Sequence, residues 1–211
     1  MEHAPLRRRK KSGADCDNRR MNDLIRPPDI HDPGGKIRIS IGPGVHGWAS
    51  MSECGKYRYE LGRYWGPAPL RSALEPYALW IGMNPSTADA RCDDPTVLRE
   101  RNYTAKVLHL QCMVKCNIMD YRATNPIDLL MPGVVPCSLD NLDIIVAHAK
   151  MAEIVILAYG AIHKRFQHYA TQLLGALTDE GVDLWCMGLT KYGHPRHPLY
   201  MKQDGQLKRF R

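Results

Sequence analysis

The hydrophobic positions of this chain fall into short runs that end abruptly in glycine, proline or polar residues. Runs of about four to eight apolar residues bounded in this way predict buried strands. Four such runs cover residues 77–82, 113–119, 153–159 and 183–189. A fifth stretch, Tyr57 to Trp65, alternates apolar with polar residues, which predicts a half-exposed strand at the edge of a sheet.

The segments between these strands carry apolar residues at helical spacing. Asp94 followed by Pro95 combines a preferred N-cap residue with proline at the first helical position, so we expect a helix from there to about residue 109. Further helices are predicted from a Ser138 cap to about residue 151, and over residues 161–178. Alternation of strands and helices is typical of a parallel sheet with helices on both faces.

The same pattern sets the expected domain organisation. We predict an α/β protein with a three-layer α/β/α architecture and a mainly parallel central sheet. Residues 1–35 are rich in arginine, aspartate, proline and glycine and lack an apolar period, so we interpret them as a flexible basic arm. Residues 36–211 are expected to form a single domain.

Composition narrows the classes of protein to consider. No apolar run approaches the ~20 residues of a membrane helix, and the basic N-terminus lacks the apolar segment of a secretory signal. The seven cysteines are scattered, and several lie in apolar runs, as is usual for reduced thiols. We therefore expect a cytoplasmic protein without membrane contact, and we infer no obligate protein partner.

Neither a cofactor nor a metal ion is predicted. No G-x-G-x-x-G or G-x-x-x-x-G-K follows a strand, so a nucleotide cofactor is not indicated. Cys112 and Cys116 form a close pair but lack the second pair that a zinc or iron–sulfur site requires. The formal net charge of +7 favours a polyanionic partner such as nucleic acid. Residues 191–211 alone carry six lysines and arginines against one acid.

Polar residues gather where three of the predicted strands end. Residues 82–86, Gly-Met-Asn-Pro-Ser, follow the first strand, residues 117–122 close the second, and residues 194–198 follow the last. The carboxyl ends of parallel strands form the usual ligand site of an open α/β sheet. We therefore expect these three segments to meet. The alternative for residues 84–86 is a plain turn before a helix, since turn residues are common after any strand.

These segments contain residue types that suit hydrolysis. The amide oxygen of Asn84 can hold a water molecule, and the ring of His197 can donate to a developing anion. A carboxylate that turns inward can act as a general base, and Asp89, Asp93 and Asp94 are the candidates.

Five motifs connect the chain to a known family. They are Tyr57-Arg58-Tyr59, Met83-Asn84-Pro85-Ser86-Thr87-Ala88-Asp89, Asp93-Asp94-Pro95-Thr96, Tyr121-Arg122-Ala123-Thr124 and His194-Pro195-Arg196-His197-Pro198-Leu199-Tyr200. With these motifs, about two thirds of the chain resembles DUF1643, a family of bacterial and phage proteins of unknown function.

The order of motifs also resembles that of the uracil-DNA glycosylase superfamily. There, a Gly-x-Asn-Pro or Gly-x-Asp-Pro loop is followed by a base-reading asparagine and later by a His-Pro-Ser loop. The corresponding places here are residues 82–85, Asn117 and His197-Pro198, with Leu199 in place of the serine. An asparagine at position 84 resembles the mismatch-specific thymine/uracil branch. The resemblance implies a uracil-DNA-glycosylase-like fold and an enzyme that acts on DNA.

Such an enzyme extrudes a nucleotide and hydrolyses the bond between base and sugar through an oxocarbenium-like transition state. The resemblance implies the catalytic residues Asn84, His197 and Asp89. The residues expected to bind the substrate are Gly82, Met83, Pro85, Ser86, Asn117, Tyr121 and Arg122. Those expected to contact DNA are Arg196, His194, Leu199, Tyr200 and Lys202. Leu199 or Tyr200 would fill the gap that the extruded base leaves.

The expected substrate is a bulky modified base, because the polar loop from Thr87 to Asp94 is long. The chain is also similar to a bacterial anti-phage DNA glycosylase that removes glucosylated hydroxymethylcytosine from phage DNA. We therefore predict phage DNA carrying this base as the partner and substrate, and anti-phage defence as the role. The alternatives are a non-catalytic protein that binds modified DNA and a hydrolase of free nucleosides or nucleotides.

Overall fold

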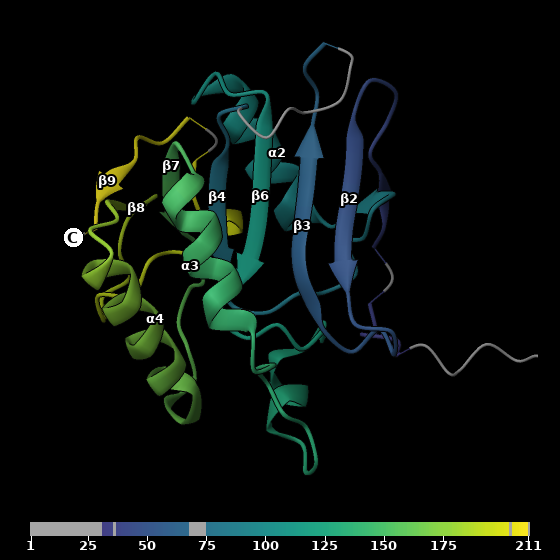
Figure 1. The fold of residues 1–211 in the computed structure, drawn as a ribbon, viewed down its shortest axis with the longest axis vertical. Coiled ribbons are helices and arrows are strands. Elements are labelled where there is room, and N and C mark those ends of the chain that lie inside the picture. Colours follow the sequence, from purple (N-terminus) through teal and green to yellow (C-terminus); the bar gives the residue numbers. More distant parts are fainter. Residues whose placement is uncertain (1–30, 36, 68–74, 203, 211) are drawn as a thin grey trace, which may run out of the picture. The chain divides into compact units, whose positions relative to one another are not determined.

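The fold is a seven-stranded mixed sheet with helices on both faces, seen in a computed structural model that describes residues 31–35, 37–67, 75–202 and 204–210 (Figure 1). The strands lie in the order β2-β3-β6-β4-β7-β8-β9. They are β2 (His46–Met51), β3 (Arg58–Tyr64), β4 (Ala78–Gly82), β6 (Cys112–Asn117), β7 (Ile154–Leu157), β8 (Leu184–Cys186) and β9 (Lys208–Arg209). Two short strands, β1 (Ile39–Ser40) and β5 (Cys92–Asp93), pair separately.

The centre of the sheet is parallel and its flanks are antiparallel. β6, β4, β7 and β8 pair in parallel, whereas β3 and β9 join this group antiparallel and β2 pairs antiparallel with β3. The predicted α/β class is confirmed, but the sheet is mixed rather than mainly parallel. The chain passes from β4 to β6 on one side and then to β7 on the other. This reversal places a topological switch point at the carboxyl end of β4, where open α/β sheets bind ligands.

Three α-helices of the described residues cover the sheet. α2 (Pro95–Lys106) lies on one face, and α3 (Asn141–Met151) and α4 (Gln167–Asp179) lie on the other (Figure 1). Within the described residues, no helix combines the length and the apolar character that crossing a lipid bilayer requires.

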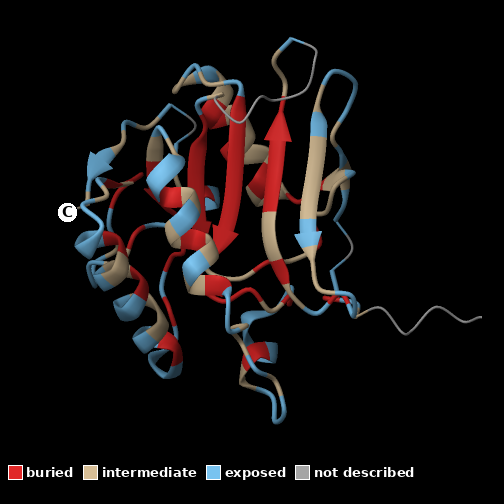
Figure 2. Ribbon diagram, in the orientation of Figure 1, coloured by how far each residue is buried: buried red, intermediate tan, exposed pale blue. Residues whose placement is uncertain are grey.

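Alternation along β4 explains why both faces are covered. Leu79 and Ile81 belong to the apolar cluster that includes residues of α3 and α4, whereas Ala78 and Trp80 pack with Tyr103 of α2. Successive side chains of a strand point to opposite faces, so a strand that is apolar throughout needs cover on both sides. Figure 2 shows the result: β4 and β6 are buried along their whole length.

The helix starts follow the sequence signals in one case and depart from them in another. Asp94 caps α2 as predicted, because its side chain accepts a hydrogen bond from the N–H of Val97 at 2.9 Å. The predicted cap at Ser138 is wrong. Its backbone N–H and its hydroxyl both bond the carboxylate of Asp120, so the side chain is used in a loop and α3 begins only at Asn141. The predicted helix over 161–178 consists of a 3₁₀ turn, η2 (Lys164–Phe166), followed by α4.

β3 corrects the prediction of an exposed edge strand. β2 pairs with its outer side, and five of its seven residues are buried. Arg58 and Arg63 are among them, with only 1% and 0% of their surface exposed. An alternating pattern could not reveal this, because the arginines find partners in the distant loop after β4 and, for Arg58, at the end of β6.

Residues just before the predicted boundary at residue 36 also bond the domain. The N–H of Thr124 donates to the carbonyl of Pro33 at 2.8 Å, and its hydroxyl donates to that of Gly34 at 2.6 Å. The compact unit accordingly starts at His31. Residues 1–30 of the predicted arm lie outside the described residues.

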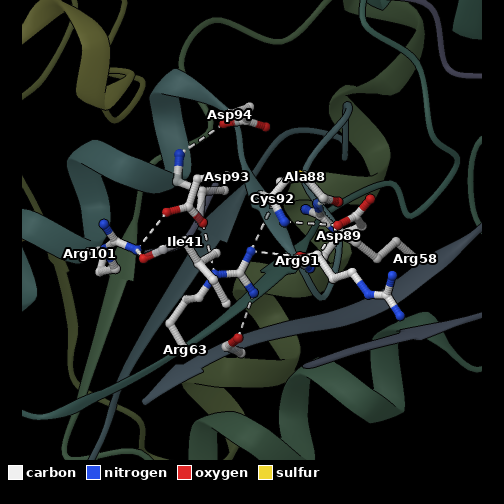
Figure 3. A network of polar contacts seen from close by, with 12 residues as sticks. Ile41, Arg58, Arg63, Ala88, Asp89, Arg91, Cys92, Asp93, Asp94 and Arg101 are labelled. Atoms are coloured by element: carbon white, nitrogen blue, oxygen red, sulfur yellow. Dashed lines mark hydrogen bonds and ion pairs between the residues drawn. The ribbon is translucent and has the colours of Figure 1, made fainter. Parts of the chain in front are cut away.

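A buried ion pair ties the loop after β4 to the sheet (Figure 3). Arg63 Nε donates to one oxygen of Asp93 at 2.8 Å, and Arg101 of α2 reaches the other oxygen at 2.9 Å. The remaining nitrogens of Arg63 donate to the carbonyls of Gly62, Asp89 and Cys92. The side chains of Arg63 and Asp93 are fully buried. This network fixes the start of α2 relative to β3.

Substitution of Asp93 tests how much the fold depends on this pair. Asp93→Asn leaves the Arg63 charge buried without a counter-ion, and we expect a loss of about 3–5 kcal/mol in the free energy of unfolding, measured in urea. The control is Lys150→Gln, which removes an exposed ion pair with Glu180 at 2.7 Å. That variant should lose less than about 1 kcal/mol. Equal losses in the two variants would contradict the assignment.

Candidate functional site

A cavity of about 370 Å³ opens at the carboxyl ends of β4 and β6. Its wall is completed by the loop after β4, the first turn of α2 and the loop that leads into η3 (Pro198–Tyr200). Three side chains remote in the sequence, Asn84, Asn117 and His197, line this one cavity. Within the part of the chain that the structure describes, no group of three or more histidine, cysteine or acidic residues is placed to hold a metal ion.

Asn84 presents its amide oxygen rather than its nitrogen. The Nδ2 group donates to the carbonyl of Ala123 at 2.6 Å and to that of Pro85 at 3.1 Å. Because a carbonyl can only accept, these bonds fix the orientation of the amide. Its Oδ1 bonds no donor among the described residues. The oxygen is therefore available to accept a hydrogen bond from water or a ligand.

Arg58 and Asn117 form the inner wall of the cavity. Arg58 Nη2 donates to Asn117 Oδ1 at 3.1 Å, and Nη1 donates to the carbonyl of Ala88 at 2.9 Å. Both side chains are almost fully buried. Burial lowers the pKa of Arg58 to about 10, so the guanidinium is charged at neutral pH. No carboxylate in the described residues forms an ion pair with it.

Two donors of this inner wall lack partners. Asn117 Nδ2 and Arg58 Nε are both buried without a hydrogen-bond acceptor. A buried donor left unpaired costs about 1–3 kcal/mol. Both residues line the cavity, and the two atoms themselves are shielded from solvent.

Gly82 makes this arrangement possible. A Cβ atom at this position would lie 2.6 Å from Asn117 Nδ2 and 3.1 Å from Lys115 Nζ, so a side chain would collide with both groups. Lys115 is itself neutralised, because Nζ donates to the two carboxylate oxygens of buried Glu100 at 2.5 and 2.7 Å. Arg58 is therefore the cation of this wall that lacks a directly bonded carboxylate.

His197 enters the cavity from the residue before η3. Gly160, with a φ of +71°, lies against it, and a Cβ there would stand 3.3 Å from His197 Cβ. Glycine suits both the left-handed backbone and the close approach. The Nδ1 atom of His197 accepts from the N–H of Leu199 at 3.4 Å, which leaves the ring proton of the neutral form on Nε2.

The surroundings of His197 keep its ring uncharged. Burial lowers its pKa from 6.5 to about 4; the nearby charge of Lys115 adds to this effect and that of Asp94 opposes it. At neutral pH the Nε2–H group is therefore a neutral donor that can stabilise a negative charge.

Asp94 is the carboxylate that the structure brings to the cavity. One of its oxygens caps α2, and the residue is largely buried. Asp89 lies off the cavity wall, where one oxygen accepts from the N–H groups of Arg91 and Cys92. Asp93 is enclosed in the ion pair described above. Of the three candidate bases, Asp94 is thus the one that lines the cavity together with Asn84 and His197.

The other predicted substrate residues divide between the cavity and its surroundings. Gly82, Met83 and Ser86 line the cavity. The carbonyl oxygen of Pro85 helps to hold the loop in place, because it accepts hydrogen bonds from the N–H of Ala123 and from Asn84 Nδ2. The remaining two residues lie in the neighbouring loop and outside the wall: Tyr121 packs on the rings of His31 and Tyr57, and Arg122 donates to the carbonyl of Gly55.

Of the predicted DNA-contacting residues, Leu199 lines the cavity. Arg196, Tyr200 and Lys202 are exposed on the chain that leads into and out of η3, and the ring of Tyr200 lies 5.8 Å from that of His197. His194 is half-buried and lines a second cavity, beside α4.

Comparison with known proteins assigns the family. The sequence model of the family described as "Protein of unknown function (DUF1643)" matches residues 58–199. The chain belongs to the DUF1643 family. The match runs from Arg58 to Leu199, and both of these residues line the cavity. Neither the curated proteins nor the solved structures that were compared gave a match.

Sequence reasoning about this DUF1643 member overlooked Arg58 and Lys115 as residues of the cavity. The sequence does contain a signal for them: each is a charged residue inside a predicted strand, and its neighbours in the sequence are apolar or aromatic. Such a residue must find a polar partner inside the fold. The sequence does not show which partner that is.

The protonation of His197 can be measured directly. In a histidine NMR titration, the resonances absent from His197→Asn should have a midpoint near pH 4, because burial disfavours the charged ring. The unfolded chain binds this proton first as the pH falls. The contribution of His197 to stability is therefore present above about pH 6.5 and is lost as the pH falls towards 4. A midpoint at 6.5 or above would contradict the buried neutral ring.

Proposed function

We propose that this protein is a DNA N-glycosylase, which hydrolyses the bond between deoxyribose and an extruded modified base and leaves an abasic site. The observation that carries the proposal is the meeting of Asn84, Asn117 and His197 at one cavity. In the superfamily that the motifs resemble, the corresponding residues hold the water, read the base and stabilise the departing base. The cavity can accept a nucleobase, and its acceptors and donors come from different segments.

The acceptors suit the attacking water. Asn84 Oδ1 accepts from the water and orients its oxygen towards C1′ of the sugar, while the Asp94 carboxylate takes up the proton that the water loses. As the new C1′–O bond forms, the bond from C1′ to the base nitrogen breaks and its electron pair stays on the base. The base anion is then protonated from solvent.

The donors suit the leaving base. Nε2–H of His197 donates to the base as negative charge develops, and the Arg58 charge behind Asn117 lowers the energy of that anion. Such preorganised donors act where water is excluded, and each is worth about 3 kcal/mol. The neutral ring can fill this role because its Nδ1 accepts from the N–H of Leu199, which leaves the ring proton on Nε2 as the donor.

The exposed basic residues next to η3 suit the DNA backbone. Arg196 and Lys202 lie on either side of the cavity residues His197 and Leu199 in the chain, so a strand bound along this segment would present a nucleotide to the cavity. Glucosylated hydroxymethylcytosine in phage DNA, and a role in anti-phage defence, remain part of this proposal as predictions.

Formation of abasic sites tests the proposal. Labelled duplexes that contain uracil, a thymine mismatch, 5-hydroxymethyluracil, glucosylated hydroxymethylcytosine or normal bases are incubated with the protein, and strand breaks are read after alkali. We expect breaks at a modified position. Asn84→Ala and His197→Asn should each lower the single-turnover rate by about a hundredfold or more.

Two controls make this result specific. Gln172→Ala removes an exposed amide on α4 and should leave the rate unchanged. Asparagine at position 197 can still accept the N–H of Leu199, so it preserves the cap of η3 while it removes the ring. An absence of alkali-labile sites on every substrate would refute the proposed glycosylase activity. Full activity in both site variants would refute its assignment to this cavity.

Contact with the DNA backbone predicts a dependence on salt. Arg196→Gln and Lys202→Gln should each weaken binding to duplexes regardless of sequence, and each should reduce the slope of log Kd against log salt by about one. Fluorescence anisotropy at several salt concentrations measures this slope. Lys150→Gln on α3 is the matched control and should leave the slope unchanged.

A further inference from the structure

We propose that the second cavity, beside α4, binds an unpaired nucleobase of the same DNA strand that enters the first cavity, the one lined by Asn84 and His197. This second base belongs to a nucleotide close to the target in the strand. The inference rests on the proposed function for the identity of the strand, and it adds a binding site that the proposed chemistry does not use.

The wall of the second cavity has the character of a small-ligand site. Its volume is about 720 Å³, and it lies between α4 and the loops that follow β7 and β8. Aromatic and aliphatic side chains form much of the wall: Tyr159, Ile162, Leu174, Tyr192 and Phe210. Polar groups are added by Gln167, Thr171 and His194. A mainly apolar wall with a few polar groups suits a nucleobase, which has two flat apolar faces and a polar edge.

The segments that form this cavity are basic. Residues 159–178 and 184–202, which supply all of its wall residues except Phe210, contain no aspartate or glutamate. The same two segments carry exposed cations at Lys164, Arg165, Lys191, Arg196 and Lys202. A cavity at the amino ends of β7 and β8 differs, since its wall includes Glu153, Glu180 and Asp183. The concentration of positive charge around the second cavity favours a polyanionic strand over an apolar peptide.

A turn connects the two cavities. Residues 188–196 fold back on themselves, and the N–H of Arg196 donates to the carbonyl of Gly188 at 2.8 Å. His194 lines the second cavity and His197 lines the first. Three residues span at most about 11 Å, which corresponds to about three stacked nucleotides at ~3.4 Å each. Exposed Arg196 lies between the two histidines in the chain, where it can contact the phosphates of this stretch.

Tyr192, near the tip of this turn, offers a surface for stacking. It is 72% exposed, so its ring packs little against the rest of the chain. The ammonium of Lys191 lies 4.8 Å from the centre of this ring. Aromatic rings next to cations are the usual means by which proteins bind unpaired bases and their phosphates. A base can reach this ring only from a single strand or from a duplex opened around the target nucleotide.

Photocrosslinking locates the strand on the protein. Single-stranded DNA of about 15 nucleotides, the upper range of common site sizes, carries 5-iodouracil at one position at a time, and mass spectrometry identifies the crosslinked residue. We expect one set of positions to crosslink to residues of the first cavity. A second set, about three nucleotides away, should crosslink to Tyr192 or His194. The absence of any crosslink to the second cavity would overturn the proposal.

Thr171→Glu places a carboxylate in the wall of the second cavity. Because it repels the strand, the Kd for single-stranded DNA should rise at least about fivefold in fluorescence anisotropy at constant salt. Gln172→Glu is the matched control: it adds the same charge at the next position of α4, which does not line the cavity. Its Kd should change less than about twofold, because salt screens an exposed charge. Equal effects in the two variants would refute the site.

Tyr192→Ala removes the stacking ring from an exposed turn, where the fold does not depend on it. The Kd for single-stranded DNA should rise at least about fivefold, and crosslinks to His194 should decrease while those to the first cavity remain. Met151→Ala is the control, because it removes an exposed side chain at the end of α3. An unchanged Kd in Tyr192→Ala would contradict the stacking role.

A second copy of the chain is the other occupant that an apolar wall can attract. In that case, light scattering would show a dimer that Thr171→Glu dissociates, and neither Thr171→Glu nor Tyr192→Ala would alter the binding of DNA. That result would overturn the proposal.

Failure of this inference can be separated from failure of the proposed function, because binding and crosslinking require no catalysis. Crosslinks to the second cavity without excision of any base would support the site and refute the glycosylase. Excision of a base, together with an unchanged Kd in Thr171→Glu and no crosslink to the second cavity, would refute the site alone.

Discussion

Two buried arginines on β3 are the constraint on which the structure depends. Burying a guanidinium is costly unless its donors are bonded. Arg63 meets this demand with the Asp93 carboxylate and three carbonyls, and Arg58 meets part of it with Asn117 and the carbonyl of Ala88. Because all of these partners except the carbonyl of Gly62 lie in the loop after β4 and at the end of β6, the arginines hold together the segments that surround the cavity.

The two arginines differ in a way that separates structure from function. The charge of Arg63 is balanced by the carboxylate of Asp93, so Arg63 has a structural role. Arg58 has a neutral partner and an unpaired Nε, so its charge acts on whatever occupies the cavity. A charge held on a buried side chain acts through a lower effective dielectric than it would in water, which strengthens its electrostatic effect. This contrast underlies the proposed chemistry.

The topology of the sheet explains why the site lies where it does. β4 has parallel neighbours on both sides. The chain goes from β4 to β6 on one side and from β6 to β7 on the other, so the loops that follow β4 and β6 diverge at the carboxyl end of β4. Gly82 and Gly160 then allow side chains from other segments to approach closely. His197, far along the chain, reaches the same wall because the loop before η3 crosses Gly160.

The sequence by itself determined the α/β class, the four parallel strands, the Asp94 cap and the strand ends that carry Asn84, Asn117 and His197. These features depend on local patterns of apolar, turn and capping residues, which act over a few positions. The tertiary structure decided the burial of β3, the loop role of Ser138, and the presence of Asp94 and Arg58 at the cavity in which Asp89 has no part. These outcomes depend on hydrogen-bond partners 18 to 59 residues away in the chain. A charged or polar group is buried only where the folded chain brings it a partner, and the local pattern of residues does not show which distant residue that will be.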